Sequence, residues 1–145
     1  MIPMFTISEE EVKDLISATD YSEALTITAG TEDVRSACEE AIAYGFRAVV
    51  AFPQYTGLLV EILEGTGIRA QIPVGFPCGG VTTLVKCTEA EQGLKLGATD
   101  LDMVMNISAF MEGDYRAVSA DIQEVRKVAK PFGIPFKVII EAGVL

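Results

Sequence analysis

Amphipathic segments and short apolar runs alternate along most of this chain. Five segments are predicted to be helices, because their apolar residues recur every three to four positions and capping residues flank them. They cover residues 7–16, 31–46, 56–67, 81–98 and 114–130. In the second of them, Val34, Cys38 and Ile42 fall on one stripe. Thr31 is its expected N-cap and Gly45 its expected C-terminal stop.

Five apolar runs follow these helices and are predicted to be strands. They cover residues 22–28, 47–53, 69–77, 99–106 and 134–140. The first run alternates, with Leu25 and Ile27 on one face, and the others are almost continuously apolar, which is typical of strands buried on both faces. Strands that alternate with helices predict an α/β fold with a parallel sheet.

Two α/β architectures fit this order of elements. Five strands can complete an open, doubly wound sheet. The alternative is a partial TIM (β/α)8 barrel, about strands 1–5 with four helices, since a whole barrel takes about 250 residues. No linker or low-complexity tract divides the chain, so residues 1–145 are predicted to form a single domain.

Composition excludes several kinds of function. The formal net charge is −10 with only 11 Lys and Arg, which argues against a nucleic-acid surface. The chain has no histidine, which excludes a Ser-His-Asp triad. Its three cysteines have no paired spacing, so we expect no disulfide framework, zinc site or other cofactor. No apolar run is long enough to span a membrane and the start is acidic, so the expected location is cytoplasmic.

Two polar residues interrupt the predicted strands and carry the candidate chemistry. Asp102 lies in TDLDMVMN, and Lys137 lies in FKVIIEAG. Burial or a neighbouring cation can lower the pKa of a lysine, and the neutral amine can then attack a carbonyl to form a Schiff base. Asp102 would move protons in that reaction. A plain ion pair between the two residues is the alternative.

The glycine-rich stretch VGFPCGGVTT, residues 74–83, follows the third predicted strand. Neither GxGxxG nor GxxxxGK[ST] occurs in the chain. The stretch is therefore predicted to be either a tight turn between strand and helix or a loop that faces substrate, where a helix N-terminus could hold an anion.

Three blocks of sequence, in this order and spacing, resemble the deoxyribose-phosphate aldolases of the class I aldolase superfamily. They are CEEAIAYGFRAVVAFPQY, VGFPCGGVTTLVKCTEAEQGLKLGATDLDMVMNISAFMEGDY and FKVIIEAG. The resemblance covers about residues 31–143 and implies the TIM-barrel fold. It also implies reversible cleavage of 2-deoxyribose 5-phosphate to glyceraldehyde 3-phosphate and acetaldehyde, in deoxyribonucleotide catabolism.

The resemblance implies a role for each matched residue. Lys137 is expected to be the Schiff-base lysine and Asp102 the catalytic aspartate. Phe76 is expected to line the substrate pocket, and Gly143 to lie in a loop that helps hold the substrate phosphate. Lys86 is expected to be structural or at the surface. The expected partner is an aldehyde or sugar phosphate, with no nucleic acid or membrane partner and with a homo-oligomer as a further expectation.

Departures from the family pattern lead to a further expectation. Ala142 stands where the family has a threonine, and the first-strand region TDYS lacks the family's histidine. Family members continue for three more strands, which carry a second lysine beside the Schiff-base lysine and most phosphate-binding loops. We therefore expect a barrel truncated after its fifth strand that is inactive alone. The alternatives are a non-catalytic half-barrel or pseudoenzyme that self-associates, and an open α/β binding domain.

Overall fold

A computed structural model describes residues 7–144 as one parallel sheet with helices along one side of it. The strands are β1 (Asp20–Ser22), β2 (Ala48–Val50), β3 (Arg69–Val74), β4 (Asp100–Val104) and β5 (Phe136–Ile139). The helices are α1 (Glu9–Ser17), α2 (Thr31–Tyr44), α3 (Thr56–Leu63), α4 (Thr83–Lys95), α5 (Ile107–Met111) and α6 (Tyr115–Ala129). Short 3₁₀ turns precede α3 and follow α6.

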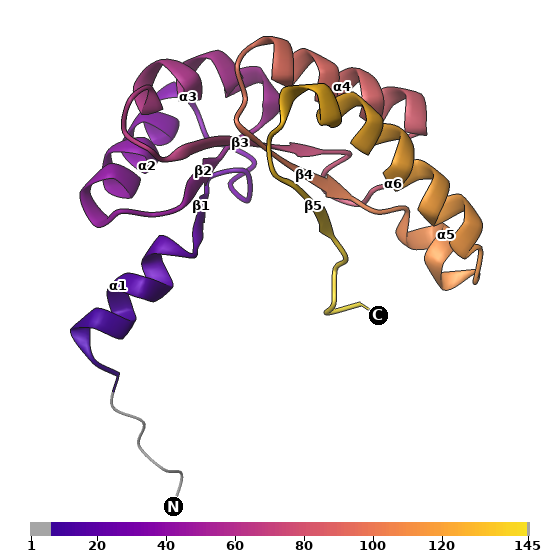
Figure 1. Ribbon diagram of the computed structural model, residues 1–145, viewed down its shortest axis with the longest axis horizontal. Helices are drawn as coiled ribbons and strands as arrows, with labels where there is room; N and C mark the ends of the chain where they lie inside the picture. The colour runs from indigo at the N-terminus through magenta and orange to yellow at the C-terminus, as the bar shows by residue number, and fades with distance from the viewer. Residues whose placement is uncertain (1–6, 145) are drawn as a thin grey trace, which may run out of the picture.

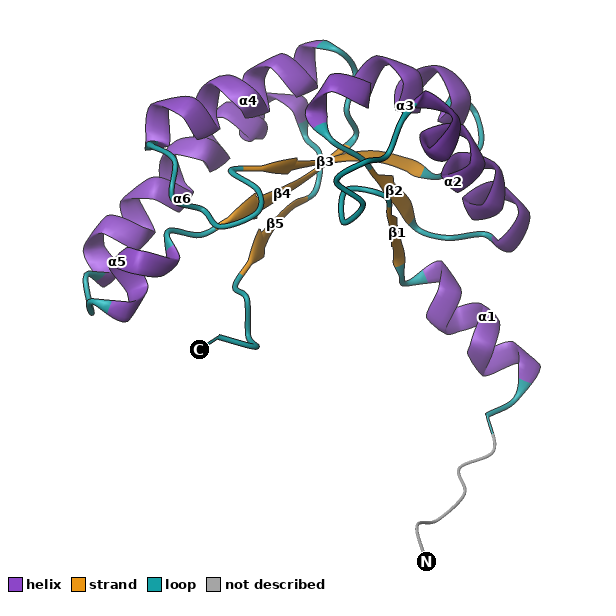
Figure 2. Ribbon diagram, turned by 180° about the vertical axis from the view of Figure 1, so that it is seen from behind, coloured by secondary structure: helices purple, strands orange, loops and turns teal. Residues whose placement is uncertain are grey.

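The strands lie in the order β1-β2-β3-β4-β5, and every neighbouring pair is parallel. The sheet bends into an arch whose convex side is covered by α2, α3, α4 and α6 (Figure 1). Seen from behind, α1 and the C-terminal end of the chain extend from the two ends of the arch (Figure 2). A doubly wound sheet would reverse its strand order and carry helices on both faces. The observed arrangement is instead an arc of a barrel.

The hydrophobic core lies between the convex face of the sheet and the helices. Ile72, Leu101 and Met103 are fully buried in this layer with residues of α4 and α6. Gly93 permits the close approach of α4, since a Cβ there would lie 1.9 Å from Ile72 Cδ1. Side chains alternate along a strand, so the intervening positions, such as Gln71, point into the concave side.

Local capping signals account for several helix boundaries. Ser8 and Glu11 form the capping box that begins α1, and Gly45 ends α2 in the left-handed conformation with φ of 77°. The predicted cap at Thr31 is wrong by one residue: the N-cap is Gly30, whose N–H donates to Asp33 Oδ2 at 2.7 Å. The predicted stripe of α2 is buried except for Ile42, which is exposed.

The prediction for the first strand is wrong. Ser22 is the last residue of β1, the rest of the predicted run, residues 23–28, forms turns and loop, and Leu25 and Ile27 are 72% and 89% exposed. The strand lies earlier, where Tyr21 pairs with Val49 in the register of β2. The alternation of Leu25 and Ile27 fails as a signal because both side chains remain largely exposed to solvent.

Candidate active site

Lys137 lies inside the arch, on the face of β5 that points away from the helices. Its strand neighbour in the sheet register is Asp102 of β4. Lys137 Nζ lies 3.0 Å from Asp102 Oδ1 and 2.6 Å from Asp20 Oδ2, and it donates to Gln71 Oε1 at 3.2 Å. The side chain is 38% exposed. The amine lies half-buried among carboxylate and amide oxygens.

Arg47 is the second cation of this cluster and precedes β2. Its Nη1 lies 2.7 Å from Asp100 Oδ2, and its Nη2 lies 2.5 Å from Asp20 Oδ1. Nη2 also donates to Gln71 Oε1 at 3.0 Å. Gln71 Nε2 in turn donates to Asp102 Oδ2. The six side chains thus form one continuous polar network, which we call the inner-face cluster: Asp20, Arg47, Gln71, Asp100, Asp102 and Lys137.

The curvature of the sheet brings the cluster together. Asp20 is on the first strand and Lys137 on the last, 117 residues apart in sequence, and neither strand pairs with the other. Their side chains meet because both point into the concave side of the arch. Gln71 and Asp100, which are fully buried and share a register position on β3 and β4, lie between them.

The pKa values of Asp20 and Asp102 are shifted in opposite directions. Burial raises the pKa of both carboxyl groups, and for Asp102 this effect exceeds the lowering by Lys137, while Asp100 and Asp20 raise the pKa further. For Asp20, the hydrogen bonds from Arg47 and Lys137 outweigh desolvation, so its pKa is lowered. Neighbouring carboxyl groups whose pKa values diverge in this way suit different roles in acid–base chemistry.

A hollow of about 220 Å³ opens beside the cluster. Asp20, Gln71 and Asp102 line it together with Phe76 and Ile139. The structure therefore brings three of the sequence-predicted residues to one place, since Lys137 contacts the residues that line the hollow. Gly143, the fourth, is not among the described residues that line it.

The loop between β3 and α4 places Phe76 at this hollow. Gly79 has φ of +66°, and a Cβ there would lie 1.8 Å from the carbonyl oxygen of Met105. The N–H groups of Gly75 and Gly79 are both used within the protein, the first bonding Glu89 Oε2 at 2.7 Å. These contacts favour the tight turn over an anion site at these two groups.

Lys86 is fully buried, although most lysines on helices are solvated. Its Nζ lies 2.6 Å from Asp121 Oδ2 and donates to the carbonyl oxygen of Val104 at 3.0 Å. Thr83 donates to the other oxygen of Asp121. Of the two expectations for Lys86, the structural one therefore holds.

The inner-face cluster contains four residues that the sequence did not reveal as site candidates. Gln71 and Asp100 show the same signal as Asp102, since each is a polar side chain within a predicted apolar strand. Each also lies two positions from another polar residue, which places both on the same face of the strand. Arg47 begins a predicted strand, and Asp20 lies just before one. Arg47 and Asp20 fall in line with the other residues of the inner-face cluster only when the observed bounds of β1 and β2 are used.

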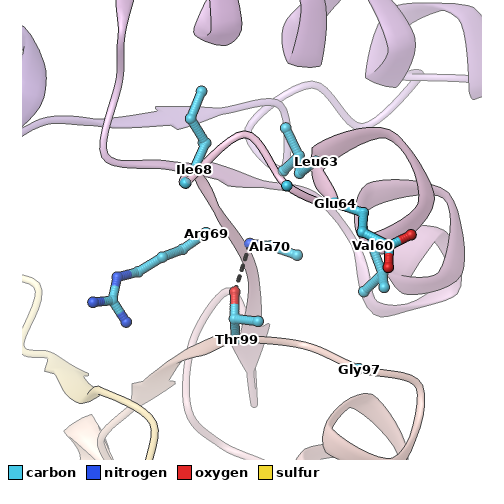
Figure 3. Close-up of a pocket in the computed structure, with 10 residues that line it drawn as sticks. Val60, Leu63, Glu64, Ile68, Arg69, Ala70, Gly97 and Thr99 are labelled. Atoms are coloured by element: carbon cyan, nitrogen blue, oxygen red, sulfur yellow. Dashed lines mark hydrogen bonds between the residues drawn. The ribbon is translucent and has the colours of Figure 1, made fainter.

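A second, larger hollow of about 450 Å³ lies at the opposite end of the strands (Figure 3). It is lined by the end of α3, the loops before β3 and β4 and the first two residues of β3. Thr99 Oγ1 accepts a hydrogen bond there from the Ala70 N–H at 2.9 Å. Glu64 and Arg69 are its charged side chains, and Arg69 extends away from Glu64. The residues that line this hollow therefore include no contact between an amine and a carboxylate such as that between Lys137 and Asp102.

Among residues 7–144, no group of three or more His, Cys, Asp or Glu side chains is arranged to hold a metal ion. In the same range, no helix combines the length and apolar character needed to cross a bilayer.

Comparisons with solved structures define the class of protein. An aldolase designated QR15 superposes with a TM-score of 0.84 and 26% identity, over 91% of this chain and 57% of that chain. The fold is therefore the partial TIM barrel of an aldolase, as predicted. A scan against models of known protein families gives no match.

The particular family follows from closer relatives. The deoxyribose-phosphate aldolase of Methanothermobacter thermautotrophicus is 39% identical over all 145 residues. The structure of the deoxyribose-phosphate aldolase of Aeropyrum pernix, described as tetrameric, has a TM-score of 0.79 and 36% identity over 92% of this chain. The resemblance to the deoxyribose-phosphate aldolase family is thereby confirmed. The chain spans 62% of the length of the first protein and 55% of the second.

Proposed function

We propose that this chain carries the Schiff-base centre of a deoxyribose-phosphate aldolase, with Lys137 as the nucleophile. The observation that carries the proposal is the position of Lys137 Nζ, 3.0 Å from the carboxylate of Asp102 on the neighbouring strand and beside a hollow. The proposed reaction is the reversible cleavage of 2-deoxyribose 5-phosphate to glyceraldehyde 3-phosphate and acetaldehyde, in the cytoplasm and in deoxyribonucleotide catabolism.

In the cleavage direction, the neutral amine of Lys137 attacks the aldehyde carbon of the open-chain sugar and gives a carbinolamine. Loss of water then gives a protonated Schiff base at C1 of the sugar. The C3 hydroxyl gives its proton to a base, the C2–C3 bond breaks, and the Schiff base accepts the electron pair of that bond to become an enamine. Glyceraldehyde 3-phosphate leaves, and the remaining enamine is protonated and hydrolysed to acetaldehyde. Asp102 is the proposed proton carrier at the carbinolamine and enamine stages, and its raised pKa suits a group that both gives and takes protons.

The other two predicted residues have proposed roles in binding. Phe76, half-buried at the rim of the hollow and 6.3 Å from Phe52 between ring centroids, would cover the apolar part of the substrate. Gly143 would contribute backbone to the phosphate site. Inactivity of these 145 residues alone and assembly into a homo-oligomer also remain predictions.

Reductive trapping tests the nucleophile directly. We expect acetaldehyde with sodium borohydride to add an ethyl group to Lys137, mapped by mass spectrometry of peptides from the whole chain. The exposed Lys95, paired with Glu91 on the surface of α4, is the internal control. We expect Lys137 to react at least about tenfold faster than Lys95, and Asp102→Asn to slow trapping at Lys137 alone.

Equal trapping of the two lysines would contradict the nucleophile role and leave the plain ion pair as the better interpretation. A coupled assay for glyceraldehyde 3-phosphate, run on the same sample, separates Schiff-base formation from the complete cleavage.

A further inference from the structure

The pairing of β3 with β4 stops at the level of the hollow. The last pair in their register is Val74 with Met103. Gly75 and Val104 follow these two residues and would form the next pair, but the N–H of Gly75 bonds outside the sheet. Backbone groups at the point where two strands separate need other partners when they are shielded from water.

Two side chains of α4 are those partners. The N–H of Gly75 donates to Glu89 Oε2 at 2.7 Å, and Lys86 Nζ donates to the carbonyl oxygen of Val104 at 3.0 Å. Lys86 and Glu89 are three positions apart on the helix, so their side chains are neighbours on one face of it. Both bonds are charge-assisted, which makes them stronger than the neutral bonds of a sheet.

Lys86 contacts both strand ends. Its aliphatic stem lies against Gly75, where a Cβ would be 2.9 Å from Lys86 Cε, and its ammonium group binds β4. The ammonium is fixed from the other side by Asp121 Oδ2 of α6, 2.6 Å away. Thr83 Oγ1 donates to the second oxygen of Asp121 at 2.8 Å. The side chain of Lys86 is fully buried, so these contacts define its position.

The two bonds from α4 lie next to residues of the proposed active site. Phe76 directly follows Gly75, and Asp102 lies two positions before Val104. Phe76 and Asp102 both line the hollow. A shift of either strand end would therefore displace one of these two side chains.

We propose that Lys86 and Glu89 are positioning residues for this site: they hold the ends of β3 and β4 in their separated positions, so that Phe76 and Asp102 both face the hollow. The inference rests on the proposed function, because the placement of these two side chains matters only if a substrate reacts there. Glu89 acts on the loop that carries Phe76, whereas Lys86 acts on the strand that carries Asp102.

Hydrogen exchange tests the contact of Glu89. Glu89→Met, made in the whole chain, removes the acceptor of the Gly75 N–H. We expect amide hydrogen exchange of residues 74–80 to rise about tenfold, while that of residues 31–44 in α2 stays unchanged. Glu89→Gln retains an oxygen acceptor and should exchange as the parent chain does.

Reductive trapping at Lys137 tests the consequence for the site. In Glu89→Met, the acetaldehyde concentration for half-maximal trapping should rise about fivefold with little change in the maximal rate, because the loop acts in binding. Glu89→Gln should restore the parent value. Glu91→Met is the matched control, since Glu91 lies on the same helix but is exposed and pairs with Lys95. It should change neither exchange nor trapping.

Lys86 is tested in the double variant Lys86→Met with Asp121→Leu, which leaves no unpaired charge between α4 and α6. We expect the maximal trapping rate at Lys137 to fall about tenfold with an unchanged half-saturating concentration, because the end of the strand that carries Asp102 is no longer held. Glu89→Met provides the test by itself if this double variant folds poorly.

A purely structural role predicts a different result. The contacts would then affect the urea midpoint, but trapping of fully folded protein would match that of the parent chain. Parent-like trapping in Glu89→Met therefore overturns the inference even if exchange of residues 74–80 is faster. Equal exchange of that segment in Glu89→Met and Glu91→Met overturns it as well.

Failure of the proposed function gives a distinct result. Lys137 of the parent chain would then be trapped no faster than Lys95, whereas exchange would still separate Glu89→Met from Glu91→Met. The hydrogen bonds from α4 would stand in that case, and their role in this reaction would fail together with the reaction.

Discussion

Asp20 and Asp102 contact the same amine in different environments. Asp20 receives hydrogen bonds from two cations, Arg47 and Lys137, and these more than repay the cost of its partial burial. Asp102 receives one cationic contact, and its burial, together with the smaller effect of the neighbouring carboxylates, opposes its ionisation. The ionised form of Asp20 is therefore favoured in the cluster, whereas the surroundings of Asp102 favour its protonated form more than water does.

We predict opposite effects on folding when each carboxylate is neutralised. Asp20→Asn should lower the free energy of unfolding at pH 7 by roughly 2 kcal/mol, because it breaks charge-assisted hydrogen bonds. Asp102→Asn should leave stability unchanged or raise it by up to about 1 kcal/mol, because the folded state disfavours the Asp102 carboxylate. Urea denaturation of both variants and the parent chain at pH 7 measures these differences.

The pH dependence gives the sign of each contribution. The folded pKa of Asp20 is lowered, so its stabilisation is present above the unfolded value of about 3.9 and is lost as the pH falls through the folded value. The folded pKa of Asp102 is raised, so acidification through that value favours the folded state. A larger loss for Asp102→Asn than for Asp20→Asn at pH 7 would contradict both assignments.

At the scale of elements, local sequence determines the helices better than the strands. The capping box at Ser8 and the glycine at position 45 define ends that need no distant partner, and both are observed. The first strand depends on pairing with β2, and no local pattern in residues 20–22 reveals it. Helix α5 was missed because it has only five residues and begins at an Asn106 cap.

The same distinction explains what could be predicted of the site. Lys137 and Asp102 stand out within apolar runs, so residue type and position were sufficient to select them. The contact between Arg47 and Asp20 requires the true start of β1, and the contact between Asp20 and Lys137 requires the curvature of the sheet. Neither is encoded in a local window, and so the polar network had to come from the structure.

Helices α4 and α6 are joined by a buried charged pair whose removal gives an element-scale prediction. Lys86→Met should cost about 3–5 kcal/mol, because Asp121 would remain buried without its cation. A double variant with Asp121→Leu should recover much of that loss. Lys95→Met, on the same helix but exposed, should change stability by less than about 0.5 kcal/mol. Urea denaturation measures all three.

If the double variant loses as much free energy of unfolding as Lys86→Met alone, the unpaired Asp121 carboxylate is not the cause of the loss in Lys86→Met. In that case the hydrogen bond from Lys86 to the carbonyl oxygen of Val104, at the end of β4, would be its main contribution.

The whole molecule is asymmetric about its sheet. On the convex side, apolar side chains from β3 and β4 are buried under helices, whereas the concave side carries the inner-face cluster and a hollow. Burial of apolar area drives folding, so most of the stabilisation must come from the convex side. The concave side can then hold charged groups at a stability cost that the helix layer offsets.

Matched isoleucines on the two faces test this division of roles. Ile72 of β3 is fully buried under α4, so Ile72→Ala should lower the free energy of unfolding by about 2–5 kcal/mol. Ile139 of β5 points into the hollow and is only half-buried, so Ile139→Ala should cost less than about 1.5 kcal/mol. Urea denaturation compares them, and of these two variants only Ile139→Ala should change the rate of reductive trapping at Lys137. Equal costs at the two positions would place part of the core on the concave side and contradict the separation of a stabilising face from a chemical one.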